Sequence, residues 1–185
     1  MNTLHVIILL VLCLQALCSS ETYSQEDARR HTYDTPNTIN NWHCDNKRAQ
    51  PESDITLFFM MKQSNIKKLL EEFDAVSDPT NPKYGKHLSN EEVNLLTAPS
   101  NFAIHTTKTY IYNFTKKKVY SSTPNSDMLE VTVPIHVAEE ILNCKYYLYT
   151  HIITGEKVYR TTEYSLPISV ASYVAAVAPT VFLHN

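Results

Sequence analysis

Apolar residues in this chain recur at two spacings, and the change from one spacing to the other predicts its strands and helices. From Ile55 to Met61 apolar residues occupy both faces of a period-two pattern, which predicts a strand. From Ser64 to Val76 they recur at helical spacing opposite Lys and Glu, which predicts an amphipathic helix capped by Ser64. The apolar stripe of this helix consists of Ile66, Leu69, Leu70, Phe73 and Val76.

Two more helices are predicted before the next strand. Ser89 and Glu92 have the spacing of a capping box, which predicts a short helix over residues 89–96. Pro99 then predicts the start of a helix that reaches residue 112 or 113, because proline is tolerated in a first helical turn.

The second half of the chain predicts further strands and one well-formed helix. The predicted strands cover residues 119–123, 128–133, 145–153, 156–163 and 177–183, and the helices cover 135–142 and 168–174. Pro134 starts the first of these helices, and Thr154-Gly155 joins two of the strands. This order is typical of an α+β fold, a ferredoxin-like split βαβ antiparallel sheet with extra helices between the first helix and the second strand.

The first 53 residues differ in composition from the rest. An apolar run before residue 18 predicts a signal peptide over residues 1–20, although no Lys or Arg precedes the run. The run is shorter than the ~20 residues that span a bilayer, so we expect no stable membrane anchor. Residues 21–53 are polar and predict an N-terminal arm, with Trp42 anchoring it to a domain over residues 54–185.

A turn-rich segment, Asp78-Pro-Thr-Asn-Pro-Lys-Tyr-Gly-Lys-His-Leu-Ser89, separates the first two predicted helices. Its prolines stop a helix from running through it, and its glycine permits a positive φ in a chain with only two glycines. The segment resembles the signature of the activation domain (prodomain) of sedolisins, the serine-carboxyl peptidases, above all that of lysosomal tripeptidyl peptidase precursors. The residues that carry this resemblance are Asp78, Pro79, Pro82, Tyr84, Gly85, Lys86, His87 and Leu88.

The resemblance, which runs from about Trp42 to the C-terminus, implies a function in binding. An activation domain of this family binds the peptidase catalytic domain, assists its folding, inhibits it and is released by acid. The catalytic residues and the calcium site of the family belong to that catalytic domain, whose motifs are absent from this sequence. We therefore expect no enzyme activity, cofactor or metal site in this chain, and a sedolisin-type catalytic domain as its partner, in cis or in trans.

Two alternatives remain open from the sequence. The chain could be the N-terminal fragment of a tripeptidyl peptidase precursor whose serine-type peptidase activity lies in a missing part. It could also be a secreted ferredoxin-like binding module for an unrelated ligand, since the fold pattern is common to many functions. The adjacent Glu139 and Glu140 do not favour catalysis, because neighbouring helix positions point about 100° apart, and we expect both at a solvated helix edge.

Four residues are predicted to form the docking face for the peptidase. The apolar second face of the first strand and the tyrosine-rich strand at 146–149 motivate this hypothesis, since aromatic side chains anchor interfaces. The four residues are Phe58, Met60, Tyr147 and Tyr149. His87 and His151 are the candidates for sensing acidic pH, because histidine titrates near ~6.5.

Composition and charge refine this picture. The net charge of −3 argues against a nucleic-acid partner, and we expect the Lys116–Lys118 run to be a solvated loop. A predicted signal peptide places the chain in the secretory pathway, with the lysosome or the extracellular space as destination. There Asn113 is a candidate for N-glycosylation. Cys44 and Cys144 could form a disulfide, or remain free or intermolecular thiols.

Overall fold

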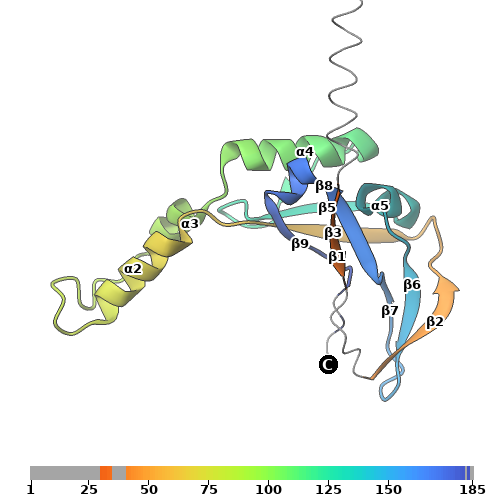
Figure 1. The fold of residues 1–185 in the computed structure, drawn as a ribbon, viewed down its shortest axis with the longest axis horizontal. Coiled ribbons are helices and arrows are strands. Elements are labelled where there is room, and N and C mark those ends of the chain that lie inside the picture. Colours follow the sequence, from red (N-terminus) through yellow and green to blue (C-terminus); the bar gives the residue numbers. More distant parts are fainter. Residues whose placement is uncertain (1–29, 35–40, 182, 184–185) are drawn as a thin grey trace, which may run out of the picture.

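The computed structural model describes residues 30–34, 41–181 and 183, so the predicted signal peptide lies outside the described residues. These residues form helices and three antiparallel sheets, which confirms the predicted α+β class (Figure 1). Within the described part of the chain, no helix is both long and apolar enough to cross a bilayer.

The largest sheet is built around β3 (Asp54–Met61), which pairs antiparallel with a strand on each side. The strand order is β4-β5-β3-β9, with β4 at Tyr120–Ser121, β5 at Met128–Pro134 and β9 at Val174–Ala178. The alternation predicted for β3 is present: Leu57 and Phe59 are fully buried, whereas Met60 on the other face is 36% exposed. The sheet therefore has one core face and one open face, and the open face includes Phe58 and Met60.

Two helices contribute to the core beside this sheet. They are α4 (Asn101–Thr115), capped by the Ser100 hydroxyl, and α5 (Ile135–Leu142), which has the predicted bounds. Ile111 of α4 and Ile141 of α5 are fully buried in the same apolar cluster as Leu57 and Phe59. Figure 1 shows α4 running over one side of the sheet.

The other two sheets use residues that the sequence pattern placed in a polar arm. β2 (Trp42–Arg48) pairs with β6 (Tyr147–His151), which also pairs with β7 (Lys157–Arg160). β1 (Arg30–Asp34) pairs with β8 (Glu163–Pro167), and the short α6 (Ile168–Ala171) follows β8. The predicted strand over 156–163 is thus split between two sheets, and Trp42 is buried, as an anchor should be. The ferredoxin-like topology stays a prediction, because the described chain contains two sheets that this topology does not include.

A helical arm, residues 65–97, extends away from the sheets (Figure 1). It consists of α2 (Ile66–Ser77), the turn at 78–89 and α3 (Asn90–Thr97). The predicted capping box of α3 is present, since Ser89 and Glu92 bond reciprocally to each other's backbone N–H. The prediction that Ser64 caps α2 is wrong: the N-cap is Asn65, which has a left-handed backbone and makes no side-chain cap.

Candidate functional site

The turn at the tip of the helical arm is held together by its own side chains. The Asp78 carboxylate accepts hydrogen bonds of 2.8 Å from the Thr80 backbone N–H and hydroxyl, and these bonds lower the pKa of Asp78. The Lys83 ammonium lies 2.8 Å from a Glu72 carboxylate oxygen. Gly85, at φ 71°, donates its N–H to the Val76 carbonyl at 2.9 Å and so closes the C-terminal end of α2. The family-like motif therefore builds a defined turn rather than a reactive site.

The apolar stripe predicted for α2 forms, but the domain does not cover it. Leu70 is 57% exposed and Phe73 is 64% exposed, while Val76 is the only buried residue that α2 contributes. Leu95 of α3 is 82% exposed. An apolar stripe of this kind on a small protein marks a surface for binding a partner.

The four residues predicted to form one docking face lie in two different sheets. Phe58 and Met60 belong to β3 in the four-stranded sheet, whereas Tyr147 and Tyr149 belong to β6 in the three-stranded sheet. Tyr149 is buried, which raises the pKa of its hydroxyl to about 12. Tyr149 is therefore not exposed for docking, and the other three residues are divided between two sheets, because alternation along a strand does not reveal which sheet the strand joins.

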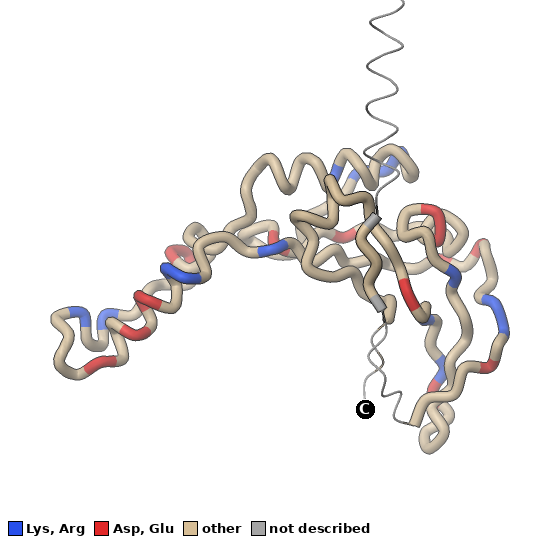
Figure 2. The backbone as a smooth tube through the Cα atoms, in the orientation of Figure 1, with Lys and Arg blue, Asp and Glu red and all other residues tan. Residues whose placement is uncertain are grey.

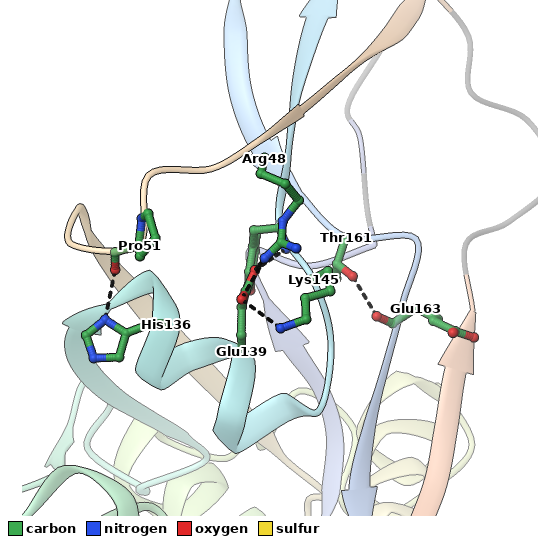
Figure 3. Close-up of polar contacts among 8 residues, drawn as sticks. Arg48, Pro51, His136, Glu139, Lys145, Thr161 and Glu163 are labelled. Atoms are coloured by element: carbon green, nitrogen blue, oxygen red, sulfur yellow. Dashed lines mark hydrogen bonds and ion pairs between the residues drawn. The ribbon is translucent and has the colours of Figure 1, made fainter.

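A surface pocket of about 600 Å³ lies beside α5 and contains a buried carboxylate that the sequence pattern missed. The Glu139 carboxylate lies 2.6 Å from the Arg48 guanidinium and 3.3 Å from the Lys145 ammonium (Figure 3). It also accepts a hydrogen bond of 2.8 Å from the Tyr146 backbone N–H. The expectation that Glu139 is solvated is wrong, whereas Glu140 is exposed as expected. A sequence signal existed: Glu139 lies one helical turn after the apolar Ile135.

This carboxylate is a structural group, because its oxygens are already bonded within the chain. The nearby Cys144 thiol also lacks reactivity, since burial raises its pKa to about 12 and keeps it protonated. Cys44 and Cys144 are free thiols, so the disulfide left open by the sequence is not formed. No cluster of three or more His, Cys, Asp or Glu side chains suited to a metal ion occurs in the described ranges.

The two candidate pH sensors lie in unlike surroundings. His87 is exposed in the turn of the helical arm. His151 is buried, with Nδ1 2.8 Å from the Thr154 hydroxyl and its ring 4.9 Å from that of Trp42. Asn113 is exposed near the end of α4, and its glycosylation stays a prediction. His87 is thus the better placed of the two histidines to contact a partner.

Comparisons with known proteins agree with these observations. Residues 40–183 match the family model described as Pro-kumamolisin, activation domain. The chain is 34% identical to human tripeptidyl-peptidase 1 over 129 residues, which are 69% of this chain and 23% of that protein. It is 28% identical to tripeptidyl-peptidase sed1 of Aspergillus fumigatus over 135 residues, which are 72% of this chain and 21% of that protein. The chain spans less than a quarter of the length of these curated relatives.

Proposed function

Because the chain belongs to the pro-kumamolisin activation-domain family, we propose that it binds a sedolisin-type peptidase domain, assists the folding of that domain and inhibits it until acidification releases it. The partner is a tripeptidyl-peptidase-like catalytic domain, in cis or in trans. The proposal assigns neither peptide hydrolysis nor a cofactor to this chain, and it places the chain in the secretory pathway, with the lysosome or the extracellular space as destination.

One observation carries the binding function: large apolar side chains are exposed on defined elements of the fold. Met60 on the open face of β3 and Phe73 on the helical arm are examples. The exposed apolar side chains support a protein surface as the ligand, because small-molecule sites are usually concave and enclosed.

The open face of the four-stranded sheet is the first surface that we assign to the peptidase. Phe58 lies opposite Glu130, and Met60 lies opposite Met128 in the same antiparallel ladder. Phe58 is half-buried and Met60 is partly exposed, so this face combines apolar area with polar neighbours, as interface centres do.

Acid release is assigned to His87. Histidine is the side-chain type whose charge changes between neutral and lysosomal pH. His87 lies beside Lys86 in a turn that also carries Lys83, so protonation adds a third positive charge to the turn. A peptidase surface that accepts the neutral imidazole then binds the protonated turn less well.

The proposal is tested by mixing the purified chain with a mature sedolisin-type tripeptidyl peptidase and measuring tripeptide release between neutral and lysosomal pH. We expect inhibition at neutral pH that is lost on acidification, together with a higher yield of active peptidase when the denatured peptidase refolds beside the chain. Failure of the chain to affect either activity or refolding would overturn the proposal. Peptide hydrolysis by the chain alone would overturn it as well.

A matched pair of variants locates the sheet contact. Phe58→Ser with Met60→Ser should weaken peptidase binding without unfolding the domain, because both side chains lie on the open face. Ile152→Ser with Ile153→Ser is the control, because these residues are 71% and 74% exposed in the β6–β7 turn. Equal affinity of the two double variants would exclude the sheet face as a contact.

The alternative that the chain is the N-terminal part of a longer peptidase precursor is supported by the length of its relatives. It predicts the same contacts within one polypeptide. Sequencing the transcript beyond residue 185 distinguishes the two cases.

A further inference from the structure

We propose that the helical arm is a second docking element, which lays the apolar stripe of α2 against the same sedolisin-type peptidase domain. This inference rests on the proposed function and adds to it a surface that lies outside the sheets. The exposed members of this stripe are Ile66, Leu70 and Phe73, which are 41%, 57% and 64% exposed. Their spacing places them on one side of the helix.

α2 has few of the usual local supports of a helix: it has the Lys67–Glu71 pair and the Gly85–Val76 backbone bond, but no side-chain N-cap and no charges that complement its dipole. It has 12 residues, with no acidic residue in its first turn and no basic residue in its last turn. Isolated helices of about 12–15 residues are marginal in water and depend on packing of an apolar face. Because the domain buries only Val76 of α2, the packing that this helix requires is supplied from outside the described chain.

The tip of the arm is already ordered by contacts within the chain. The Asp78–Thr80 hydrogen bonds, the Lys83–Glu72 ion pair and the Gly85–Val76 backbone bond fix the turn against α2. Both signs of charge lie along the arm (Figure 2), so its charged residues give no single-sign surface for nucleic acid or an anionic membrane. A surface whose shape is set before binding loses little conformational freedom on docking, which favours affinity.

The extent of the family match points to a peptidase domain as the occupant of this surface. The family match at residues 40–183 includes the whole arm, and the tripeptidyl-peptidase relatives have more than three quarters of their length outside the matched region. Figure 1 shows the arm sloping away from the side of the four-stranded sheet on which α4 lies. Because Ile111 of α4 packs in the core with Leu57 and Phe59, the arm slopes toward the open face of the sheet. A single peptidase domain bound to that face would also contact the arm. A second copy of this chain would not need to contact both surfaces.

The test compares the full chain with a Leu70→Ser, Phe73→Ser variant for binding to a mature tripeptidyl peptidase at neutral pH. We expect the variant to bind at least about tenfold more weakly and to keep its thermal midpoint, since both side chains are exposed. The Ile152→Ser, Ile153→Ser variant again serves as the control and should bind like the wild type. Hydrogen exchange on the wild-type complex should show new protection of the α2 amides.

Each outcome has a distinct meaning. If the wild type does not bind, the proposed function fails; if the wild type and the arm variant bind equally, the arm inference alone fails. Should the double variant lose its fold, Leu95→Ser and the exchange experiment decide, because Leu95 is 82% exposed. A concentration-dependent dimer of the wild type that the arm variant abolishes, without a change in peptidase affinity, would assign the stripe to a second copy and overturn the inference.

Discussion

At the residue scale, the carboxylates of this chain differ by the partners that reach them. Glu139 and Glu140 are neighbours in α5, yet the first is buried among cations and the second is exposed. The sequence correctly predicted that Glu140 is solvated but wrongly predicted the same for Glu139. The reason is that Arg48 lies far away in the chain and reaches α5 only through the pairing of β2 with β6. Helical periodicity locates the apolar side of α5 but not the strand that packs beside it.

Removing the Glu139 carboxylate should therefore destabilise the fold. Glu139→Ala leaves the Tyr146 backbone N–H without its acceptor and removes the ion pairs of Arg48 and Lys145, so we expect a loss of about 2–3 kcal/mol in the free energy of unfolding. Glu140→Ala should change it by under about 0.5 kcal/mol. Urea unfolding measures both, and equal midpoints for the two variants would show that the Glu139 cluster does not stabilise the domain.

Asp127 gives a pH-dependent prediction. Burial raises its pKa, but hydrogen bonds from Thr123, Gln63 and Asn125 outweigh burial and lower the pKa below the usual value. The charged form is therefore favoured by folding, and this stability is present above pH ~4 and is lost as pH falls through the lowered pKa. Asp127→Asn should cost under about 1 kcal/mol at neutral pH and nothing at strongly acidic pH. If the difference in free energy of unfolding between the wild type and Asp127→Asn were the same at every pH, this prediction would be contradicted.

At the element scale, the sequence predicted most elements, missed β1, β2 and all of β8 except Glu163, and placed the last strand at 177–183 instead of Val174–Ala178. The helices at α4 and α5 and the strands at β3 and β5 lie within a few residues of the predicted ranges, because each has a clear apolar period. β1 and β2 were missed because their residues are polar and pair only with strands from the C-terminal half. The period of α2 was correct, yet periodicity could not show that its apolar side lies outside the core.

Gly85 provides a test of how the turn supports α2. Gly85→Ala places a side chain at φ 71°, which costs about 1–2 kcal/mol for an L-residue, while a Cβ there meets no atom within 4 Å. We expect faster hydrogen exchange in the last turn of α2 and unchanged exchange in β3. Gly155→Ala is the matched control, because Gly155 has φ 72° and equally open surroundings but lies in the β6–β7 turn. Faster exchange in α2 of the Gly155 variant would refute this local account.

At the scale of the whole molecule, one apolar core joins residues from the sheets, α4 and α5, and the helical arm lies beside it. The sequence indicated the binding role through the resemblance of the turn and the exposed face of β3. It could not join Tyr147 or Tyr149 to that face, because the membership of β6 in another sheet depends on long-range pairing. The turn and the open face of β3 were thus predictable from local sequence, whereas the strands that share a sheet with β3 were not.

The two cysteines differ in burial, so their reactivity distinguishes the core from the surface. Cys144 is buried with a pKa raised to about 12, whereas Cys44 is only partly buried. A thiol reagent should modify Cys44 in the native chain and reach Cys144 only at the rate of global unfolding. Mass spectrometry of quenched reactions gives both rates. Equal rates for the two thiols, or a reagent-resistant pair in the non-reduced chain, would contradict the free and unequal cysteines.

The pairing of β3 with β9 has a consequence for biosynthesis. Phe59 lies opposite Val177, so the inner strand of the main sheet gains its second neighbour from residues near the far end of the described chain. Contacts between such distant residues form slowly, because a long loop must close first. A nascent chain on the ribosome therefore carries one bare edge of β3 until residues 174–178 have emerged, and this unpaired edge is open to aggregation during that interval.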